Sequence, residues 1–151
     1  MDQKRRLAVL GSTGSIGTQA LDVAARHAER FQVVALTANS NREKLFAQVR
    51  AFRPSFAALT GEQLSLRDVP EDLRFCHWSF GHAALMEAAE FADADDVLVA
   101  VVGMAGLESV LAALARKKRV LLANKEALVA GGKLVMDAAR IAGSLSLLPV
   151  D

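Results

Sequence analysis

The glycine-rich string GSTGSIG at residues 11–17 constrains the fold more than any other part of this 151-residue sequence. It follows the apolar run 7–10 and precedes residues 16–25, whose apolar side chains recur at helical spacing. In a strand, turn and helix of this kind, Gly11 permits a sharp turn, Gly14 removes a side chain beside the backbone, and Gly17 lets the helix pack closely. Three glycines can also serve a tight turn alone, but this context favours a turn that binds the phosphates of a dinucleotide.

Backbone amides at the start of the expected helix supply the donors for such a site. The amides of Gly14, Ser15 and Ile16 lie at the positive end of the helix dipole, where they can donate to phosphate oxygens. The hydroxyls of Thr13 and Ser15 add further polar groups. We therefore predict that the pyrophosphate binds to the following residues: Gly11, Thr13, Gly14, Ser15, Ile16 and Gly17.

The rest of the chain alternates between short apolar runs and segments of helical periodicity. After the strand at 7–10, further strands are expected at residues 31–38, 56–59, 74–78, 97–102, 120–123 and 145–150. Further helices are expected at 45–52, 81–91, 103–116 and 125–142, the last interrupted near Gly131 and Gly132. This alternation predicts an α/β, Rossmann-like, doubly wound and mainly parallel sheet with helices on both faces. With 52% hydrophobic residues and no linker, residues 1–151 are expected to form a single domain.

Charge and cysteine content exclude several classes of protein. The net charge of +1 gives no field suited to nucleic acid or an anionic membrane, so neither is an expected partner. The apolar run 7–10 is too short for a signal peptide or a membrane span. The single cysteine, Cys76, cannot form an internal disulfide, and no Cys/His cluster indicates zinc. We therefore expect a soluble cytoplasmic protein whose metal, if it binds one, has oxygen ligands.

The end of the second expected strand indicates which dinucleotide is bound. NAD enzymes place a carboxylate there for the ribose, whereas this chain has Asn39, Ser40 and Asn41, followed by Arg42. Amide, hydroxyl and guanidinium groups suit a 2′-phosphate, which favours NADPH over NADH. Arg42 fits equally well a solvated residue in the first turn of the next helix.

Polar residues also follow the strand expected at 120–123. Ligands of open α/β sheets bind at the carboxyl ends of the strands, which is where Asn124, Lys125 and Glu126 are expected. Asn124 suits a helix cap, and the next two residues suit an exposed first turn. A lysine in a first turn opposes the helix dipole, however, which favours a functional role for Lys125.

Four strings together, GSTGSIG, VLVAVVGMAGL, LLANKEALV and LLPVD, resemble the N-terminal part of the 1-deoxy-D-xylulose 5-phosphate reductoisomerase family over essentially the whole chain. The resemblance implies an oxidoreductase that uses NADPH and a divalent metal, Mg²⁺ or Mn²⁺. Its sugar phosphate substrate, 1-deoxy-D-xylulose 5-phosphate, is isomerised and reduced to 2-C-methyl-D-erythritol 4-phosphate in the non-mevalonate route to isoprenoids.

The resemblance also implies roles for individual residues of this chain. Residues 13–16, residues 39–41, Asn124 and Glu126 match cofactor-binding positions. Lys125 matches a substrate-contacting lysine, and Asp151 matches the first carboxylate ligand of the metal. Many relatives have a glycine and then a basic residue where this chain has Asn39 and Ser40, so the partner of the 2′-phosphate is an open question here.

The resemblance further implies that the catalytic and C-terminal domains lie outside these residues. The metal-binding string of the family continues after the aspartate with a serine and a glutamate, and Mg²⁺ prefers six oxygen ligands. Asp151 alone cannot supply them, so we expect the 151 residues by themselves to be inactive. The full-length protein is expected to be a homodimer.

Two other classes of protein fit the glycine turn. Another NADP-dependent dehydrogenase, such as a semialdehyde dehydrogenase, would need a nucleophilic cysteine downstream, but Cys76 precedes the strand at 97–102 and has no motif around it. A non-catalytic nucleotide sensor would keep the turn without needing residues 124–126 or Asp151. The histidines, His27, His77 and His82, lack metal-ligand spacing and are expected to be structural.

Overall fold

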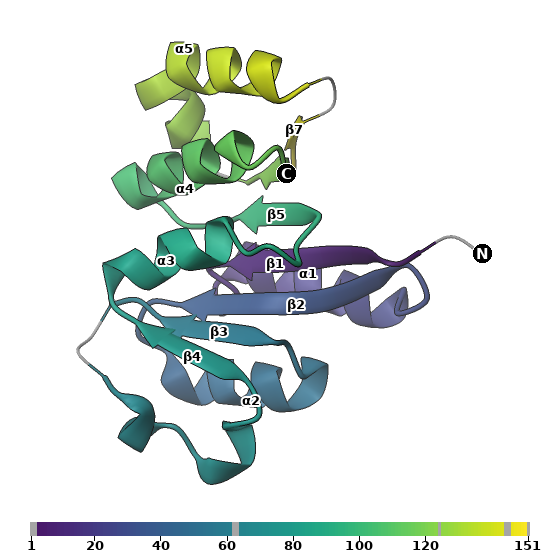
Figure 1. Ribbon diagram of the computed structural model, residues 1–151, viewed down its shortest axis with the longest axis vertical. Helices are drawn as coiled ribbons and strands as arrows, with labels where there is room; N and C mark the ends of the chain where they lie inside the picture. The colour runs from purple at the N-terminus through teal and green to yellow at the C-terminus, as the bar shows by residue number, and fades with distance from the viewer. Residues whose placement is uncertain (1–2, 62–63, 124, 144–145, 151) are drawn as a thin grey trace.

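The structure is a computed structural model that describes residues 3–61, 64–123, 125–143 and 146–150, with only the backbone for residues 125–130. Within these residues, seven strands form one sheet in the order β4-β3-β2-β1-β5-β6-β7, and every neighbouring pair is parallel (Figure 1). The strands are β1 (Arg5–Leu10), β2 (Phe31–Ala38), β3 (Phe56–Leu59), β4 (His77–Phe80), β5 (Asp96–Val99), β6 (Arg119–Leu122) and β7 (Leu147–Pro149). The helices are α1 (Ser15–Arg26), α2 (Arg42–Phe52), α3 (His82–Ala89), α4 (Gly103–Ala115) and α5 (Lys125–Ala142).

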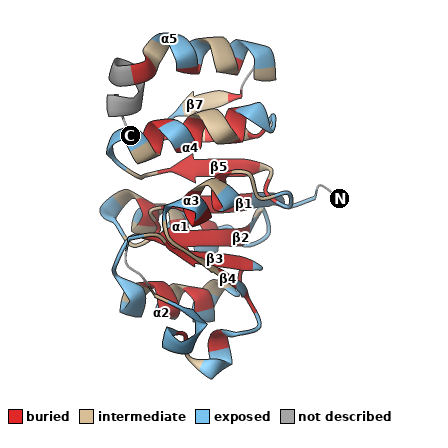
Figure 2. Ribbon diagram, turned by 60° about the vertical axis from the view of Figure 1, so that its left-hand side comes forward, coloured by how far each residue is buried: buried red, intermediate tan, exposed pale blue. Residues whose placement is uncertain are grey.

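Helices cover the sheet on two faces and create two cores. Successive side chains of a strand point to opposite faces, so Leu7 and Val9 of β1 enter the core under α1 and α2, whereas Ala8 and Leu10 enter the core under α3 and α4. Helix α5 packs on α4 at one end of the molecule. The central strands β1, β2 and β5 are therefore buried on both sides (Figure 2). The α/β, Rossmann-like prediction with helices on both faces is confirmed.

The face that carries α1 is less completely covered beside β5 and β6. An apolar groove of about 270 Å³ lies there, and Leu98, Leu121 and Val150 contribute to its walls. Val23 on the rim of α1 is 51% exposed. Helix α1 thus leaves part of this face of the sheet open to a groove.

The strand order places a topological switch point between β1 and β5. Chain connections run to β2 on one side of β1 and to β6 on the other side of β5. Loops that leave the carboxyl ends of β1 and β5 therefore diverge and open a crevice between them, which is where open α/β sheets bind ligands.

Most of the predicted strands have slightly different bounds in the structure, and two of them differ by three residues at one end. The strand expected at 74–78 is instead β4, because the amide of Cys76 still closes a turn onto the carbonyl of Leu73, and pairing with β3 begins only near His77. The strand expected at 97–102 ends at Val99, because the chain then leaves the sheet toward Gly103, whose φ of +75° starts α4. The interruption expected in α5 is confirmed, since Gly131 has non-helical angles.

No helix in the described part of the chain is long and apolar enough to cross a membrane.

Candidate functional site

The glycine turn is bonded to the end of the neighbouring strand. Gly11 has a φ of +82°, and its amide donates to both the carbonyl oxygen and the hydroxyl of Thr37, each at 3.1 Å. The amide of Ser12 donates to the same carbonyl at 2.8 Å. The turn after β1 is thus held at the carboxyl end of β2, beside the switch point.

The three glycine positions of the turn differ in whether the fold requires glycine there. A Cβ on Gly17 would lie 2.2 Å from the carbonyl oxygen of Gly11, and a Cβ on Gly11 would lie 2.9 Å from the carbonyl oxygen of Ala100. Gly14 instead has ordinary extended angles, and its Cβ would stay 3.7 Å from the nearest atom. The fold therefore requires glycine at positions 11 and 17 but leaves room for a side chain at Gly14.

Gly14 is also the N-cap of α1, and it has no side chain with which to cap the helix. The first-turn amides of an α-helix have no preceding carbonyl within the helix to bond. The amides of Ser15, Ile16 and Gly17 are in this position, at the positive end of the helix dipole. They form a set of donors suited to an anion.

Helix α2 braces the turn from the side. The hydroxyl of Ser12 donates to Gln48 Oε1 at 2.7 Å, and Gln48 Nε2 donates back to the carbonyl of Ser12 at 2.9 Å. Lys44 Nζ donates to the carbonyl of Thr13 at 2.9 Å. These contacts connect the glycine turn, α2 and the end of β2 in one bonded unit.

A cavity of about 400 Å³ opens beside the glycine turn, at the carboxyl ends of the central strands. It is lined by residues that follow β1, β2, β3 and β5 and by residues at the starts of α3 and α4: Gly11, Thr13, Gly14, Thr37, Asn39, Thr60, His82, Leu85, Ala100, Val101, Val102 and Ala105. Its position coincides with the switch point between β1 and β5.

The cavity wall divides into a polar side and an apolar side. Hydroxyl and amide groups of Thr37, Thr60 and Asn39 come from the ends of β2 and β3. Leu85 of α3 and Val102 before α4 supply apolar surface, and Val102 is 73% exposed. An occupant with an apolar ring system and polar substituents fits such a wall.

The position of the Asn39 side chain depends on the glycine at position 61. A Cβ on Gly61 would lie 2.0 Å from Asn39 Oδ1, so only glycine lets this amide side chain lie there. The amide of Gly61 also donates to the carbonyl of Asn39 at 2.8 Å. Asn39 is therefore held by the loop after β3.

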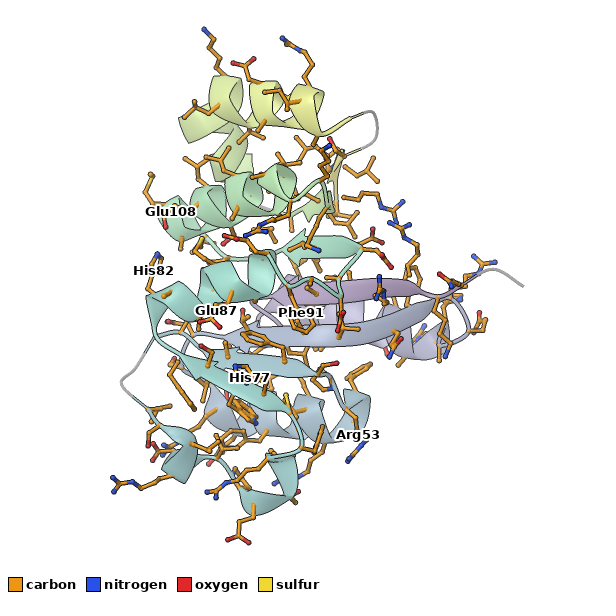
Figure 3. All side chains as sticks on the ribbon, in the orientation of Figure 1. Arg53, His77, His82, Glu87, Phe91 and Glu108 are labelled. Carbon is orange, nitrogen blue, oxygen red and sulfur yellow. The ribbon has the colours of Figure 1, made fainter. Side chains whose placement is uncertain are left out.

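A side-chain contact within hydrogen-bond distance joins α3 and α4 at the rim of the cavity. His82 Nε2 lies 2.9 Å from Glu108 Oε2, and the two side chains face one another at the edge where the strands end (Figure 3). Glu87, further along α3, accepts from the Ser79 hydroxyl at 2.9 Å. The expectation that His82 is a structural residue agrees with this pairing, although its ring also lines the cavity.

The structure brings part of the predicted cofactor site together. Gly11, Thr13, Gly14 and Asn39 line one cavity. Ser15 and Gly17 belong to the start of α1 beside it, whereas the side chain of Ile16 lines the apolar groove on the other side of the turn. Only the backbone of Ile16 is therefore available to a ligand in the cavity.

The predicted residues that follow Asn39 are not among those that line the cavity. Ser40, Asn41 and Arg42 are exposed. Asn41 caps α2, since its side chain accepts from the amide of Lys44 at 3.2 Å.

The predictions near residue 125 and at residue 151 are less completely tested. Lys125 and Glu126 form the first turn of α5, while Asn124 and Asp151 lie outside the described residues. Among the described residues, no group of three His, Cys, Asp or Glu side chains could hold a metal ion.

Sequence reasoning missed several cavity residues. Thr37 and Thr60 had a usable signal, because each lies where a buried parallel strand ends. Leu85 and Ala105 had none, since they read as ordinary core positions of α3 and α4. Lys44 does not line the cavity but contacts the glycine turn, and it was missed because its contact with Thr13 joins residues 31 positions apart.

Comparison with known proteins gives a consistent set of relatives. The family model described as 1-deoxy-D-xylulose 5-phosphate reductoisomerase matches residues 7–132. The enzyme of that name from Ralstonia nicotianae is 48% identical over 97% of this chain, and the one from Burkholderia mallei is 48% identical over 98%. The chain spans 38% of the length of each of these relatives.

Solved structures agree with the sequence relatives. The reductoisomerase from Zymomonas mobilis in complex with NADPH superposes with a TM-score of 0.90 at 42% identity, over 99% of this chain and 39% of that one. A DOX-P reductoisomerase in complex with magnesium gives 0.88 at 36% identity, over 99% of this chain and 38% of that one. Biliverdin reductase from Synechocystis, at 22% identity and a TM-score of 0.65 over 95% of this chain and 37% of that one, shares the fold alone.

Proposed function

Because this chain belongs to the 1-deoxy-D-xylulose 5-phosphate reductoisomerase family, we propose that it forms the NADPH-binding domain of such an enzyme, comprising residues 1–151. The observation that carries the proposal is the cavity at the switch point, which opens directly beside the glycine turn. A relative with 42% identity is an NADPH complex, which supports the choice of cofactor.

The residues present fit a dinucleotide. Gly14 is a glycine that the fold does not need, and close approach of a pyrophosphate gives it a reason. The amides of Ser15 and Ile16 would donate to the phosphate oxygens, and Thr13, which lines the cavity, adds a hydroxyl to this turn. The adenosine would occupy the cavity between Val102 and the polar groups at the ends of β2 and β3.

The same cavity favours NADPH over NADH. The end of β2 presents Asn39 rather than a carboxylate, so a ribose diol has no acidic partner there. Ser40, Asn41 and Arg42 continue the polar surface at the start of α2, where a 2′-phosphate would meet hydroxyl, amide and positively charged groups.

We extend the proposal to the whole enzyme of which this domain would be part. It would isomerise and reduce 1-deoxy-D-xylulose 5-phosphate to 2-C-methyl-D-erythritol 4-phosphate, with Mg²⁺ or Mn²⁺ as the metal, in the cytoplasm and as a homodimer. Lys125 would contact the substrate, Asn124 and Glu126 the cofactor, and Asp151 the metal. A relative in complex with magnesium supports the metal.

Calorimetric titration of the 151-residue chain with NADPH and with NADH tests the cofactor proposal. We expect saturable binding of NADPH that is at least tenfold tighter than binding of NADH. Equal affinity for the two would contradict the interpretation of Asn39 and its neighbours, and no binding of either would contradict the proposed function.

A turnover assay tests whether the 151 residues are catalytically active without the rest of the proposed enzyme. We expect no steady oxidation of NADPH when the 151 residues alone meet substrate and Mg²⁺, followed by nicotinamide absorbance. Steady turnover would show that these residues hold a complete catalytic site.

A further inference from the structure

We propose that Lys44 supplies the positive charge that recognises the 2′-phosphate of NADPH in this chain. The inference rests on the cofactor proposed above. It names the residue that would bind the 2′-phosphate, the group that distinguishes NADPH from NADH. The question arises because Asn39, Ser40 and Asn41, at the end of β2, carry no positive charge.

The position of Lys44 is fixed by the glycine turn. Its Nζ lies 2.9 Å from the carbonyl oxygen of Thr13, and Thr13 lines the cavity together with Asn39. The ammonium therefore lies against the turn after β1, and its helix α2 begins directly after the segment that follows β2. These are the two segments that flank the adenosine ribose in a dinucleotide-binding sheet.

The ammonium retains the capacity to bind a ligand. An ammonium has three donors, so one bond to the carbonyl of Thr13 leaves it able to donate to a phosphate oxygen as well. The Lys44 side chain is half-buried. Partial burial lowers the effective dielectric and strengthens a contact with an anion relative to one on the open surface.

The surroundings of Lys44 hold it in place before a ligand arrives. Its backbone amide donates to the capping side chain of Asn41 at 3.2 Å, and Gln48, one turn later, exchanges two hydrogen bonds with Ser12. Because α2 is docked on the turn in this way, less side-chain entropy remains to be lost on binding.

The electrostatic environment at the start of α2 also favours binding of an anion near Lys44. Lys44 lies in the first turn of α2, where a cation opposes the positive end of the helix dipole. An anion bound at this end would interact favourably with both the dipole and the ammonium. Arg42 is also in this turn but is exposed, and the structure gives Lys44, not Arg42, the contact with the glycine turn.

The test compares a ligand that carries the 2′-phosphate with one that lacks it. We expect Lys44→Gln to weaken NADPH binding about tenfold or more, the loss of one charge-assisted hydrogen bond, and to change NADH binding by less than about twofold. Adenosine 2′,5′-bisphosphate and 5′-AMP should show the same contrast. Lys44→Arg should recover most of the NADPH affinity and should serve as the folded reference if the glutamine variant is unstable.

Two controls separate charge recognition from simple bracing of the turn. Gln48→Leu removes the neighbouring brace but no charge, and it should weaken NADPH and NADH by similar factors. Lys133→Gln removes an exposed lysine of α5, at the other end of the molecule from α2, and should change neither affinity (Figure 1).

The outcomes are distinguishable. A parallel loss of both ligands in Lys44→Gln would assign the lysine to bracing and overturn the proposal. If the unchanged chain prefers NADPH and Lys44→Gln keeps that preference, this inference fails while the cofactor assignment stands. If the unchanged chain binds neither nucleotide, both fail together.

Discussion

The Cβ that Gly17 lacks would lie 2.2 Å from the carbonyl oxygen of Gly11, so the first turn of α1 packs directly against the turn that precedes it. The obstacle is backbone, which cannot rotate away as a flexible side chain can. We expect Gly17→Ala to lower the free energy of unfolding by about 3 kcal/mol, as overpacking does, measured by urea denaturation. Gly132→Ala is the matched control, because a Cβ there has no atom within 4 Å, and it should change stability by less than about 1 kcal/mol. Equal effects of the two substitutions would contradict this account of the turn.

Gly14→Ala should affect the ligand rather than the fold. The added Cβ would stay 3.7 Å from the nearest protein atom, and the backbone angles of Gly14 suit any residue. We therefore expect an unfolding free energy within about 1 kcal/mol of the unchanged chain, the range of ordinary surface substitutions. NADPH affinity should fall about tenfold or more, because the methyl group would lie where a pyrophosphate approaches the backbone. Calorimetry and thermal denaturation on the same samples would measure both, and unchanged NADPH affinity would remove the ligand-based reason for Gly14.

Asp96 connects the edges of β1 and β6 at the amino end of the sheet. It is fully buried, bonds to Arg5, and accepts from Arg119 at 2.7 and 3.0 Å. Replacing it by asparagine would leave two guanidinium groups without their carboxylate, so we expect Asp96→Asn to cost about 3 kcal/mol of stability in urea denaturation. Asp22→Asn, an exposed carboxylate paired with Arg26 on α1, should cost less than about 1 kcal/mol. A small effect at Asp96 would mean that solvent replaces the carboxylate at this edge.

Most elements of the fold follow from local patterns in the sequence. The strands at 31–38 and 56–59 were predicted with the bounds of β2 and β3, because each is a run of mostly apolar or β-branched residues that parallel pairing largely buries. Residues 74–76 misled the prediction because the apolar Phe75 and Cys76, which suggested a strand, are also compatible with a turn. Cys76 is buried beneath the helical turns at 66–73, not within the sheet.

The candidate site was only half predictable for a different reason. Gly11 and Gly14 are recognised from a spacing within seven residues. His82 and Leu85, in contrast, reach the cavity only because β4 adds to the far edge of the sheet and directs α3 back across it. Their position in the cavity depends on long-range topology, so no short sequence motif identifies them as cavity residues.

Burial makes the Cys76 thiol chemically inert in the folded protein. The residue is 4% exposed, and desolvation raises the pKa of the thiol to about 12. Because the thiolate is the reactive form, iodoacetamide at pH 8 should label the native chain at least 100 times more slowly than the chain in guanidinium chloride. Mass spectrometry at timed intervals would measure both rates. Comparable rates would show that the region around β4 opens readily.

Asp95 should contribute to acid unfolding. Burial by itself raises the pKa of its carboxyl, but hydrogen bonds from the guanidinium and the backbone amide of Arg6 outweigh this and hold the pKa below its usual value. A carboxyl whose folded pKa is depressed stabilises the protein above its unfolded pKa of about 3.9, and this contribution is lost as the pH falls through the folded pKa. We therefore expect Asp95→Asn to be less stable than the unchanged chain above about pH 5, with the difference shrinking below about pH 4.

Urea denaturation at a series of pH values would measure that difference. The neighbouring Asp93 provides the control, since its side chain is 61% exposed and lies 4.0 Å from Arg6. Asp93→Asn should change stability by less than about 0.5 kcal/mol at every pH, as exposed pairs do. A gap between the unchanged chain and Asp95→Asn that stayed constant down to pH 2 would contradict this account, because the stabilisation would then not depend on the charge of the carboxylate.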